Sequence, residues 1–432
     1  MTSKLFSKTI IFLTLLSVIL SAHLVQARVY LDITQAELQK LPVAVPSFVD
    51  KASPNIPSDK GRAMAELMGK ALTLHGFISV VNPALPHSAS ILDWKNGGAD
   101  LVVLANYTTD QGRLVMELRC IDTNADQMLV GKKYRTSWEK SSSLIRKFAD
   151  EIIMKLSNES GISNTQIAFV SDISGSKEVY VADILGEKIR QVTRHKKITV
   201  SPRFSPDGGR LAYTSYHRGN PNLYITDLSQ SKTTKAVSWQ EGLNVAPAWA
   251  LDSKSMIITL SKDGNPDLYQ MTIDGKVQKR LTKNEGINVS PSMAPDGKRF
   301  AFVSDRTGKP QIYIMDLASK RVDRLTHHGT ENTTPSWSPK GDLIAYTGRA
   351  DGNYHIFLIS PEGGSPVQLT QYWGDHESPS WSPDGKQLVF SRNRSGKHQL
   401  CTVFLKGSGV IPLFESHKGN QTFPQWSPRL QY

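Results

Sequence analysis

Few residues in this chain of 432 stand at the spacings that catalytic motifs require. His376-Glu377 lacks the second His of a His-Glu-x-x-His zinc site, and the sequence has no Gly-x-Ser-x-Gly, P-loop or Gly-x-Gly-x-x-Gly motif. His327-His328 is typical of a solvated loop pair. Asp263-Gly264-Asn265-Pro266-Asp267 resembles a calcium loop only loosely, because the terminal Glu is missing, and indicates a turn. We therefore predict no enzyme, no metal and no cofactor, and a protein that works by binding other proteins.

An internal repeat predicts the elements that would carry such a binding surface. A Pro is followed two residues later by an aromatic residue or Met and then by a turn, often Pro-Asp-Gly, whose residues favour chain reversal. Alternating apolar runs between polar loops indicate four antiparallel strands in each repeat, the size of one β-propeller blade. The leading prolines recur every 44 or 45 residues, at Pro202, Pro247, Pro291, Pro335, Pro379 and Pro424.

The repeats predict a six-bladed β-propeller over residues 165–432. We call the strand around each leading Pro strand A, and the next three strands B, C and D. The first B strand, near Ile167, precedes every A strand, so the last A strand, around Pro424, is expected to complete the first blade and close the ring. The aromatic residues of the repeat are expected to pack between blades. They are Phe204, Trp249, Trp337, Trp381 and Trp426.

Basic residues are frequent in the predicted B–C loops, which share one face of a propeller with the D–A loops. Acidic residues in the same loops, such as Asp172, Asp263, Asp305 and Asp351, reduce this excess. Two interpretations stay open: a solvated rim, or a basic crown that steers an acidic partner to the channel mouth. The basic residues are Lys177, His217, Arg218, Lys262, Arg306, Lys309, Arg349, Arg392, Arg394 and Lys397.

Residues 28–160 lack the repeat and predict a small α/β domain, so the overall class is α+β with two domains. Strands are expected over 41–49, 77–81, 100–107 and 114–122, and helices over 60–74 and 141–156, the first capped by Ser58 or Asp59. The second helix is expected to bury a stripe of Leu144, Phe148, Ile152 and Leu156. The alternating residues 28–34 fit equally an edge strand of this domain and a segment offered to a partner by strand addition.

The first 27 residues predict a cleaved signal peptide. Lys4 and Lys8 precede an apolar run over residues 10–20, and Val25-Gln26-Ala27 has the small residues that a signal peptidase reads. The run is about half of the length that a membrane-spanning helix needs. We therefore expect export to a periplasm.

The net charge and the cysteines agree with an exported protein. The formal charge is +12, and most of the basic excess lies in the propeller region. An exported protein rarely meets nucleic acid, so an acidic protein or a cell-envelope polymer is the expected partner. Cys120 and Cys401 lie in apolar, strand-like runs and are expected to be buried free thiols rather than a disulfide.

In the order of its parts, the chain resembles the TolB family, periplasmic components of the Tol–Pal system. The resemblance covers the signal peptide, the α/β domain and six repeats of the Pro-x-Trp-Ser-Pro-Asp-Gly type. It also includes Asp93-Trp94-Lys95-Asn96-Gly97-Gly98-Ala99-Asp100 in the first domain. The resemblance implies an adaptor that binds the lipoprotein Pal at the channel mouth and engages TolA of the inner membrane. It also implies a role in outer-membrane integrity and constriction at division, with outer-membrane proteins or peptidoglycan as further partners.

The resemblance also implies which residues face the partners. The residues just before the leading prolines would face Pal, whereas the first mature residues would engage TolA. This chain departs from well-known relatives at Leu243 and at Val289-Ser290, where they carry a His and a Thr-Glu pair. The Pal-facing candidates are Leu243, Asn244, Ala246, Val289, Ser290, Thr334, Arg306 and Arg349, and the TolA-facing candidates are Arg28, Val29, Tyr30, Leu31 and Asp32.

Two other functions remain possible from the sequence. One is a secreted propeller that binds peptidoglycan or another glycan, which a basic face would also suit. The other is a relative of the propeller-type hydrolases, although the α/β-hydrolase domain of prolyl peptidases is not recognisable in this sequence.

Overall fold

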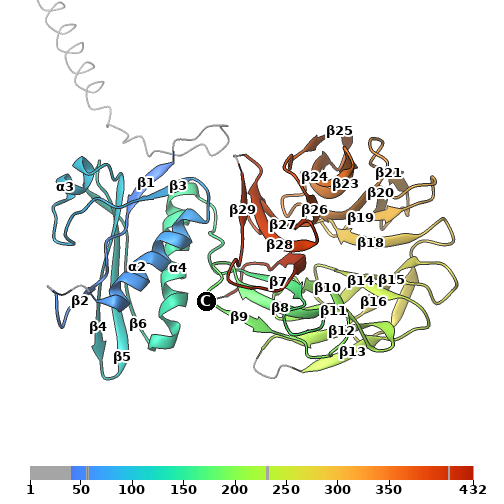
Figure 1. The fold of residues 1–432 in the computed structure, drawn as a ribbon, viewed down its shortest axis with the longest axis horizontal. Helices are drawn as coiled ribbons and strands as arrows, with labels where there is room; N and C mark the ends of the chain where they lie inside the picture. The colour runs from blue at the N-terminus through green and yellow to red at the C-terminus, as the bar shows by residue number, and fades with distance from the viewer. Residues whose placement is uncertain (1–39, 55, 57, 230–232, 407–408, 432) are drawn as a thin grey trace, which may run out of the picture. The chain divides into compact units, whose positions relative to one another are not determined.

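A computed structural model describes residues 40–54, 56, 58–229, 233–406 and 409–431 (Figure 1). The predicted signal peptide and the predicted TolA segment, residues 28–34, lie outside the described residues. Within those residues, no helix is both long and apolar enough to cross a membrane. The described chain forms an α/β domain followed by six four-stranded sheets.

The α/β domain is built on one mixed sheet with the order β3-β1-β4-β5-β6, and β2 pairs with the far end of β4. Strands β1, β3 and β4 are parallel, whereas β4, β5 and β6 form an antiparallel meander. The strands are β1 (Leu41–Ala44), β2 (Val49–Asp50), β3 (Ile78–Val81), β4 (Leu101–Asp110), β5 (Arg113–Asp122) and β6 (Gln127–Thr136).

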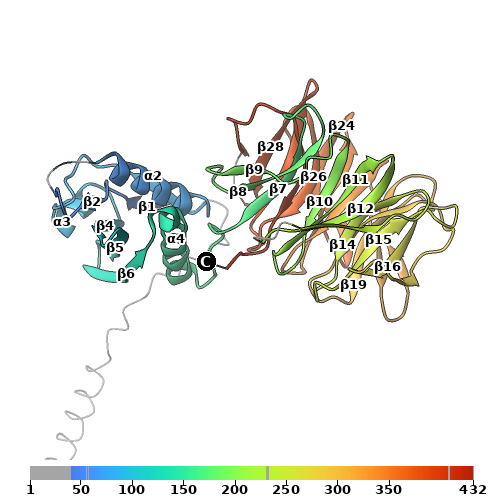
Figure 2. The same cartoon turned by 90° about the horizontal axis from the view of Figure 1, so that it is seen from below.

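The two long helices, α2 (Asp59–Thr73) and α4 (Ser141–Ser157), lie side by side on this sheet (Figures 1 and 2). Ser58 caps α2 by accepting a hydrogen bond from the backbone N–H of Gly61, as predicted. A short helix, α3 (Ile91–Asn96), begins with a capping box between Ser90 and Asp93. The helices therefore cover apolar sheet residues and leave their polar faces to solvent.

The propeller has six sheets, and each consists of four antiparallel strands in chain order, except that the first is completed by the C-terminal strand. In the register of that closure, Thr422 pairs with Val170 and Trp426 with Ile167, which confirms the predicted ring closure. We number the blades from the one that contains β7. Figure 1 shows successive sheets following one another around the ring, with the colour running from green through yellow to red.

The blade strands have the following bounds. Blade 1 contains β30 (Gln421–Trp426), β7 (Gln166–Ser171), β8 (Glu178–Asp183) and β9 (Ile189–Gln191). Blade 2 contains β10 (Thr199–Phe204), β11 (Arg210–Arg218), β12 (Asn220–Asp227) and β13 (Thr234–Ser238). Blade 3 contains β14 (Asn244–Trp249), β15 (Ser255–Leu260), β16 (Asp267–Thr272) and β17 (Val277–Arg280).

The second half of the ring follows the same plan. Blade 4 contains β18 (Asn288–Met293), β19 (Arg299–Ser304), β20 (Gln311–Asp316) and β21 (Val322–Arg324). Blade 5 contains β22 (Asn332–Trp337), β23 (Ile344–Ala350), β24 (Asn353–Ser360) and β25 (Gly363–Gln368). Blade 6 contains β26 (Asp375–Trp381), β27 (Gln387–Arg394), β28 (Lys397–Phe404) and β29 (Val410–Pro412).

The propeller core lies between neighbouring blades, where the repeat aromatics are buried as predicted. Trp249 packs with Ala212 and Leu223 of blade 2, and its indole N–H donates to the carbonyl of Arg203, 3.1 Å away. Trp381 bridges blades 5 and 6 in the same way, with its N–H donating to Ser336 at 2.8 Å. An indole both fills apolar volume and bonds the adjacent blade, so it fixes the angle between them.

Both cysteines are buried and free, as the sequence predicts. Burial raises the pKa of the Cys401 thiol to about 11, so it is inert at neutral pH.

Candidate functional site: the channel mouth

The predicted Pal-facing residues lie at equivalent positions on neighbouring A strands. Ala246, Ser290 and Thr334 each directly precede the leading Pro of β14, β18 and β22. Strand A is the innermost strand of a blade, and the D–A loops open on one face of the ring. The structure thus brings these three residues to the same mouth of the propeller from blades 3, 4 and 5.

Each A strand carries a bulge at this point. The pairing register with strand B shifts between Val289 and Ser292 in blade 4, and equivalent shifts occur in the other five blades. The residue before the leading Pro is left-handed at Ser290 (φ 54°) and Thr334 (φ 47°). A left-handed L-residue costs about 1 kcal/mol or more. The same conformation occurs at Ser201, Ser378 and Phe423.

Asn residues at the first position of three A strands are fully buried and hold the loops that precede them. Asn244 accepts hydrogen bonds from the Ser238 hydroxyl at 2.5 Å and from the backbone N–H of Gln240 at 2.9 Å. Asn332 donates to the Gln311 side chain at 2.8 Å. Asn244 was among the predicted contact residues. Since its side chain is 0% exposed, it would contribute by positioning the mouth rather than by touching a partner.

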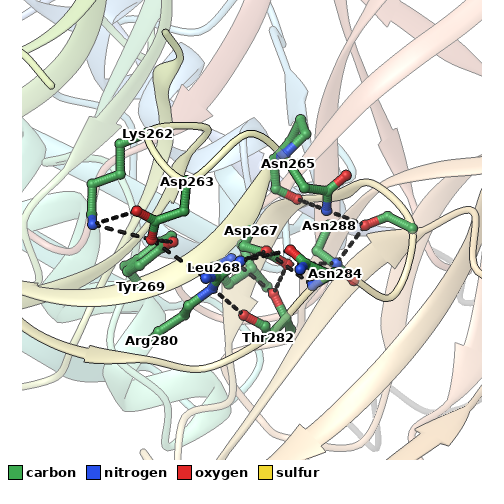
Figure 3. A network of polar contacts seen from close by, with 12 residues as sticks. Lys262, Asp263, Asn265, Asp267, Leu268, Tyr269, Arg280, Thr282, Asn284 and Asn288 are labelled. Atoms are coloured by element: carbon green, nitrogen blue, oxygen red, sulfur yellow. Dashed lines mark hydrogen bonds and ion pairs between the residues drawn. The ribbon is translucent and has the colours of Figure 1, made fainter. Parts of the chain in front are cut away.

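The corresponding Asn288 belongs to a charged network in blades 3 and 4 (Figure 3). The buried carboxylate of Asp267 accepts from Arg280 at 2.6 Å, from Thr282 at 2.7 Å and from Asn288 at 3.0 Å. Burial alone would raise the pKa of Asp267, but hydrogen bonds from Arg280, Thr282 and the backbone N–H of Asn284, with the charge of Arg280, hold it below the ordinary value. Asp267 therefore stays ionised and links strands C and D of blade 3 to strand A of blade 4.

The same network occupies the loose calcium-loop pattern of the sequence. Asp263 accepts from Tyr269 at 2.7 Å and pairs with Lys262 at 3.1 Å, and Arg280 lies against both carboxylates (Figure 3). Two cations already neutralise the two Asp side chains, so the loop is a structural turn. Among the described residues, no group of three or more His, Cys, Asp or Glu side chains is placed to hold a metal ion.

The two predicted arginines differ in their availability. Arg306 is only 17% exposed; it pairs with Glu285 at 2.9 Å, donates to Asn288 at 3.0 Å, and lies over the Tyr313 ring. Arg349 is exposed and lies 5.9 Å from the centroid of the Tyr354 ring. Arg349 can therefore reach a partner directly, whereas Arg306 mainly fixes the β19–β20 loop. Leu243, Val289, Ser290 and Thr334 are partly exposed.

Sequence reasoning missed the apolar side chains on the D–A loops. Trp239 and Trp373 are each 64% exposed, in the β13–β14 and β25–β26 loops. Ile198 and Ile287 are 50% and 45% exposed in two further D–A loops. The available signal was a large apolar residue inside a polar loop and outside the repeat positions, which packing between blades does not explain.

Comparison with known proteins covers both regions of the chain. The family model of the TolB beta propeller domain matches residues 153–430, and that of the TolB amino-terminal domain matches residues 29–129. The Tol-Pal system protein TolB of Desulfotalea psychrophila is 43% identical over 244 residues, 56% of this chain and 56% of that protein. The Desulfosudis oleivorans protein of the same name is 36% identical over 263 residues, 58% of this chain and 60% of that protein.

These alignments thus span somewhat more than half the length of the relatives. A solved structure extends the likeness, since the crystal structure of TolB from Acinetobacter baumannii superposes with a TM-score of 0.79 at 27% identity. That superposition covers 91% of this chain and 98% of the Acinetobacter chain. With the six-bladed ring and the α/β domain in the same order, the chain belongs to the TolB family.

Proposed function

We propose that this protein is a periplasmic adaptor of the Tol–Pal system, exported by a signal peptide cleaved after Ala27. Its channel mouth would bind the soluble domain of Pal, and residues Arg28–Asp32 would engage TolA. The protein would thereby link the outer membrane to the inner-membrane complex and support envelope integrity and constriction at division. The relatives named above carry the name Tol-Pal system protein, and the proposal extends this role to the present chain.

One structural observation supports the Pal site above the others. Ala246, Ser290 and Thr334 occupy one repeated position on three adjacent A strands, and each of these strands begins with a buried Asn. The buried Asn244, Asn288 and Asn332 brace the loops beside them. A mouth with several braced loops can bind a partner with little loss of conformational entropy.

The test is calorimetry of residues 28–432 with the soluble domain of Pal from the same organism. Ala246→Arg is expected to weaken binding at least tenfold, because a long charged side chain would block close approach at the mouth. The matched control is Leu251→Arg in the same blade, since Leu251 is 52% exposed in the loop between β14 and β15 on the other face. No binding by the folded wild-type protein, or equal loss in the two variants, would refute the proposed site.

The TolA contact has a separate test. A peptide with the sequence of residues 28–34 is expected to compete with the intact protein for the periplasmic domain of TolA, and a scrambled peptide is not. If deletion of residues 28–34 leaves TolA binding unchanged, the N-terminal assignment is wrong.

A further inference from the structure

Three consecutive D–A loops present a large apolar side chain to solvent. They are Ile198 between β9 and β10, Trp239 between β13 and β14, and Ile287 between β17 and β18, exposed by 50%, 64% and 45%. These loops lead into blades 2, 3 and 4, so the three side chains follow one arc of the mouth. We call Ile198, Trp239 and Ile287 the apolar arc.

The backbone of the apolar arc is held in place. Asn244 bonds Ser238 and Gln240, the two residues that flank Trp239, at 2.5 and 2.9 Å. The backbone N–H of Ile287 donates to the Asp305 carboxylate at 2.6 Å. An exposed side chain on a braced loop keeps its position in the free protein, so it loses little entropy when a partner covers it.

The loops around the apolar arc carry a surplus of positive charge. Two of their acidic residues are paired, Glu285 with Arg306 at 2.9 Å and Asp263 with Lys262 at 3.1 Å, whereas Glu241, beside Trp239, has no ion-pair partner among the described residues. Several basic residues of the same loops also have no ion-pair partner within the described part of the chain. They are Arg194, Lys196, Lys197, Arg218, Lys283 and Lys309.

The loops around Trp373 differ in charge and in availability. Arg394 lies 5.6 Å from the centroid of the Trp373 ring and donates to its backbone carbonyl at 3.3 Å. The nearby loops contain the acidic residue Asp351. Glu331 and Asp375 lie close to Glu377, and burial together with these two carboxylates raises the pKa of Glu377. Arg349, Arg392, Arg394 and Lys397 in the same region balance these carboxylates, so an acidic partner would be favoured more strongly at the apolar arc, where basic residues are in excess, than near Trp373.

We propose that the apolar arc is the anchor of the Pal contact, with Trp239 as its dominant residue and an acidic, apolar-centred surface of Pal as its occupant. The proposal rests on the function proposed above and assigns that contact to one side of the mouth. Trp residues near the centre of an interface commonly dominate its binding energy, and a surrounding ring of charges sets the rate of encounter.

Trp239→Ala and Trp373→Ala form a matched pair, because both indoles are equally exposed on the same face. In calorimetry against the soluble domain of Pal, Trp239→Ala is expected to weaken binding by about 30-fold or more. Trp373→Ala is expected to change it by less than about 3-fold. The urea unfolding midpoints of both variants should equal that of the wild type, which separates a binding loss from misfolding.

The association rate of a charge-reversal variant provides a second test. Lys283→Glu is expected to slow association with Pal while changing dissociation little, and added salt should reduce the difference from the wild type. If the wild type binds Pal but Trp239→Ala binds equally well, the arc is not the anchor although the proposed function stands. Equal losses from both Trp variants would also overturn the assignment, whereas absence of wild-type binding would overturn the proposed function itself.

Discussion

The imidazole rings of His355 and His376 lie 5.6 Å apart, centroid to centroid, between blades 5 and 6. One blade earlier, the equivalent residues are Gln311 and Asn332, which share a hydrogen bond of 2.8 Å. His376 is fully buried, and neither of its ring nitrogens has a hydrogen-bond partner in the described structure. The seam between blades 5 and 6 therefore lacks a polar link that the preceding seam has.

Restoring that link should stabilise the propeller. The double variant His355→Gln/His376→Asn copies the pair of the preceding blade and removes unpaired buried nitrogens, each of which costs about 1–3 kcal/mol. We expect the free energy of unfolding at pH 7.5 to rise by about 1 kcal/mol or more in urea titrations. The two single variants should each gain less than the double variant. A double variant that is less stable than either single variant would contradict this account.

The same histidine predicts a window of pH sensitivity. Burial, His355 and Arg392 lower the pKa of His376 from 6.5 to about 4. Between these values the unfolded chain binds a proton that the folded chain rejects, so stability falls as the pH drops from 6.5 towards 4. The loss amounts to about 3 kcal/mol for this group at about 1.4 kcal/mol per pKa unit. The advantage of His376→Asn over the wild type in unfolding free energy should therefore widen as the pH falls through that window, and a constant difference from pH 7.5 to 4 would refute the assignment.

Asp267 should matter for stability far more than its neighbour Asp263. Asp267→Asn removes the buried charge that pairs with Arg280 at 2.6 Å, and we expect a loss of about 2–3 kcal/mol at pH 7. Asp263→Asn is the matched control, because Asp263 contacts the same arginine from a site 38% exposed, where solvent screens the pair, and its loss should cost clearly less stability.

The pH dependence supplies a further check on Asp267. Its pKa is lower in the folded protein than the ordinary 3.8, so its contribution is present above that value and is lost as the pH falls through the folded-state pKa. The difference between wild type and Asp267→Asn should therefore shrink only in acid below about pH 4. Equal unfolding midpoints for the two Asn variants at pH 7 would show that the network is not required.

Two glycines with similar backbone angles should respond differently to Ala. Gly275 (φ 88°) and Gly264 (φ 94°) are both left-handed, so Ala strains both by about 1 kcal/mol or more. A Cβ on Gly275 would lie 2.2 Å from the Val237 carbonyl oxygen of blade 2, whereas a Cβ on Gly264 would meet nothing within 4 Å. Gly275→Ala should thus cost at least about 2 kcal/mol more than Gly264→Ala in thermal or urea unfolding. Similar costs for the two variants would mean that blades 2 and 3 can move apart at Gly275 without loss of stability.

The sequence predicted the propeller well because each blade is a local meander. Strands A to D follow one another within about 44 residues, and turns such as Pro206-Asp207-Gly208 mark their limits. An aromatic residue occupies the repeat position in five blades and Met293 occupies it in blade 4, so the burial of the aromatic residues between blades could be inferred from the period. Ring closure followed from counting, because one A strand remained for the one blade that lacked it.

The α/β domain was predicted less completely. Strand β6 (Gln127–Thr136) was missed, because its outer face is polar and exposed and gives little apolar alternation. The strand expected over 41–49 is interrupted between β1 and β2, where Pro46 has no N–H for a ladder bond. In α4 the buried residues include Ile145, Ala149 and Ile153, whereas Leu144 and Leu156 are only partly buried. Phe148 and Ile152 belong both to the predicted stripe and to the buried face that the structure shows. Only packing against the sheet and α2 therefore decided how the helix is rotated about its axis.

The sequence by itself determined the repeat, the number of blades, the closing strand and the positions of the residues before each leading Pro, because local turn chemistry and a fixed period specify them. Only the tertiary structure decided which of those residues are accessible. It buried Asn244 as a brace, engaged Arg306 with Glu285, and joined Ile198, Trp239 and Ile287 along one arc. Exposure depends on how loops from different strands and blades meet around the ring, as where Arg306 of the β19–β20 loop pairs with Glu285 of the β17–β18 loop. No pattern along the chain encodes these contacts directly.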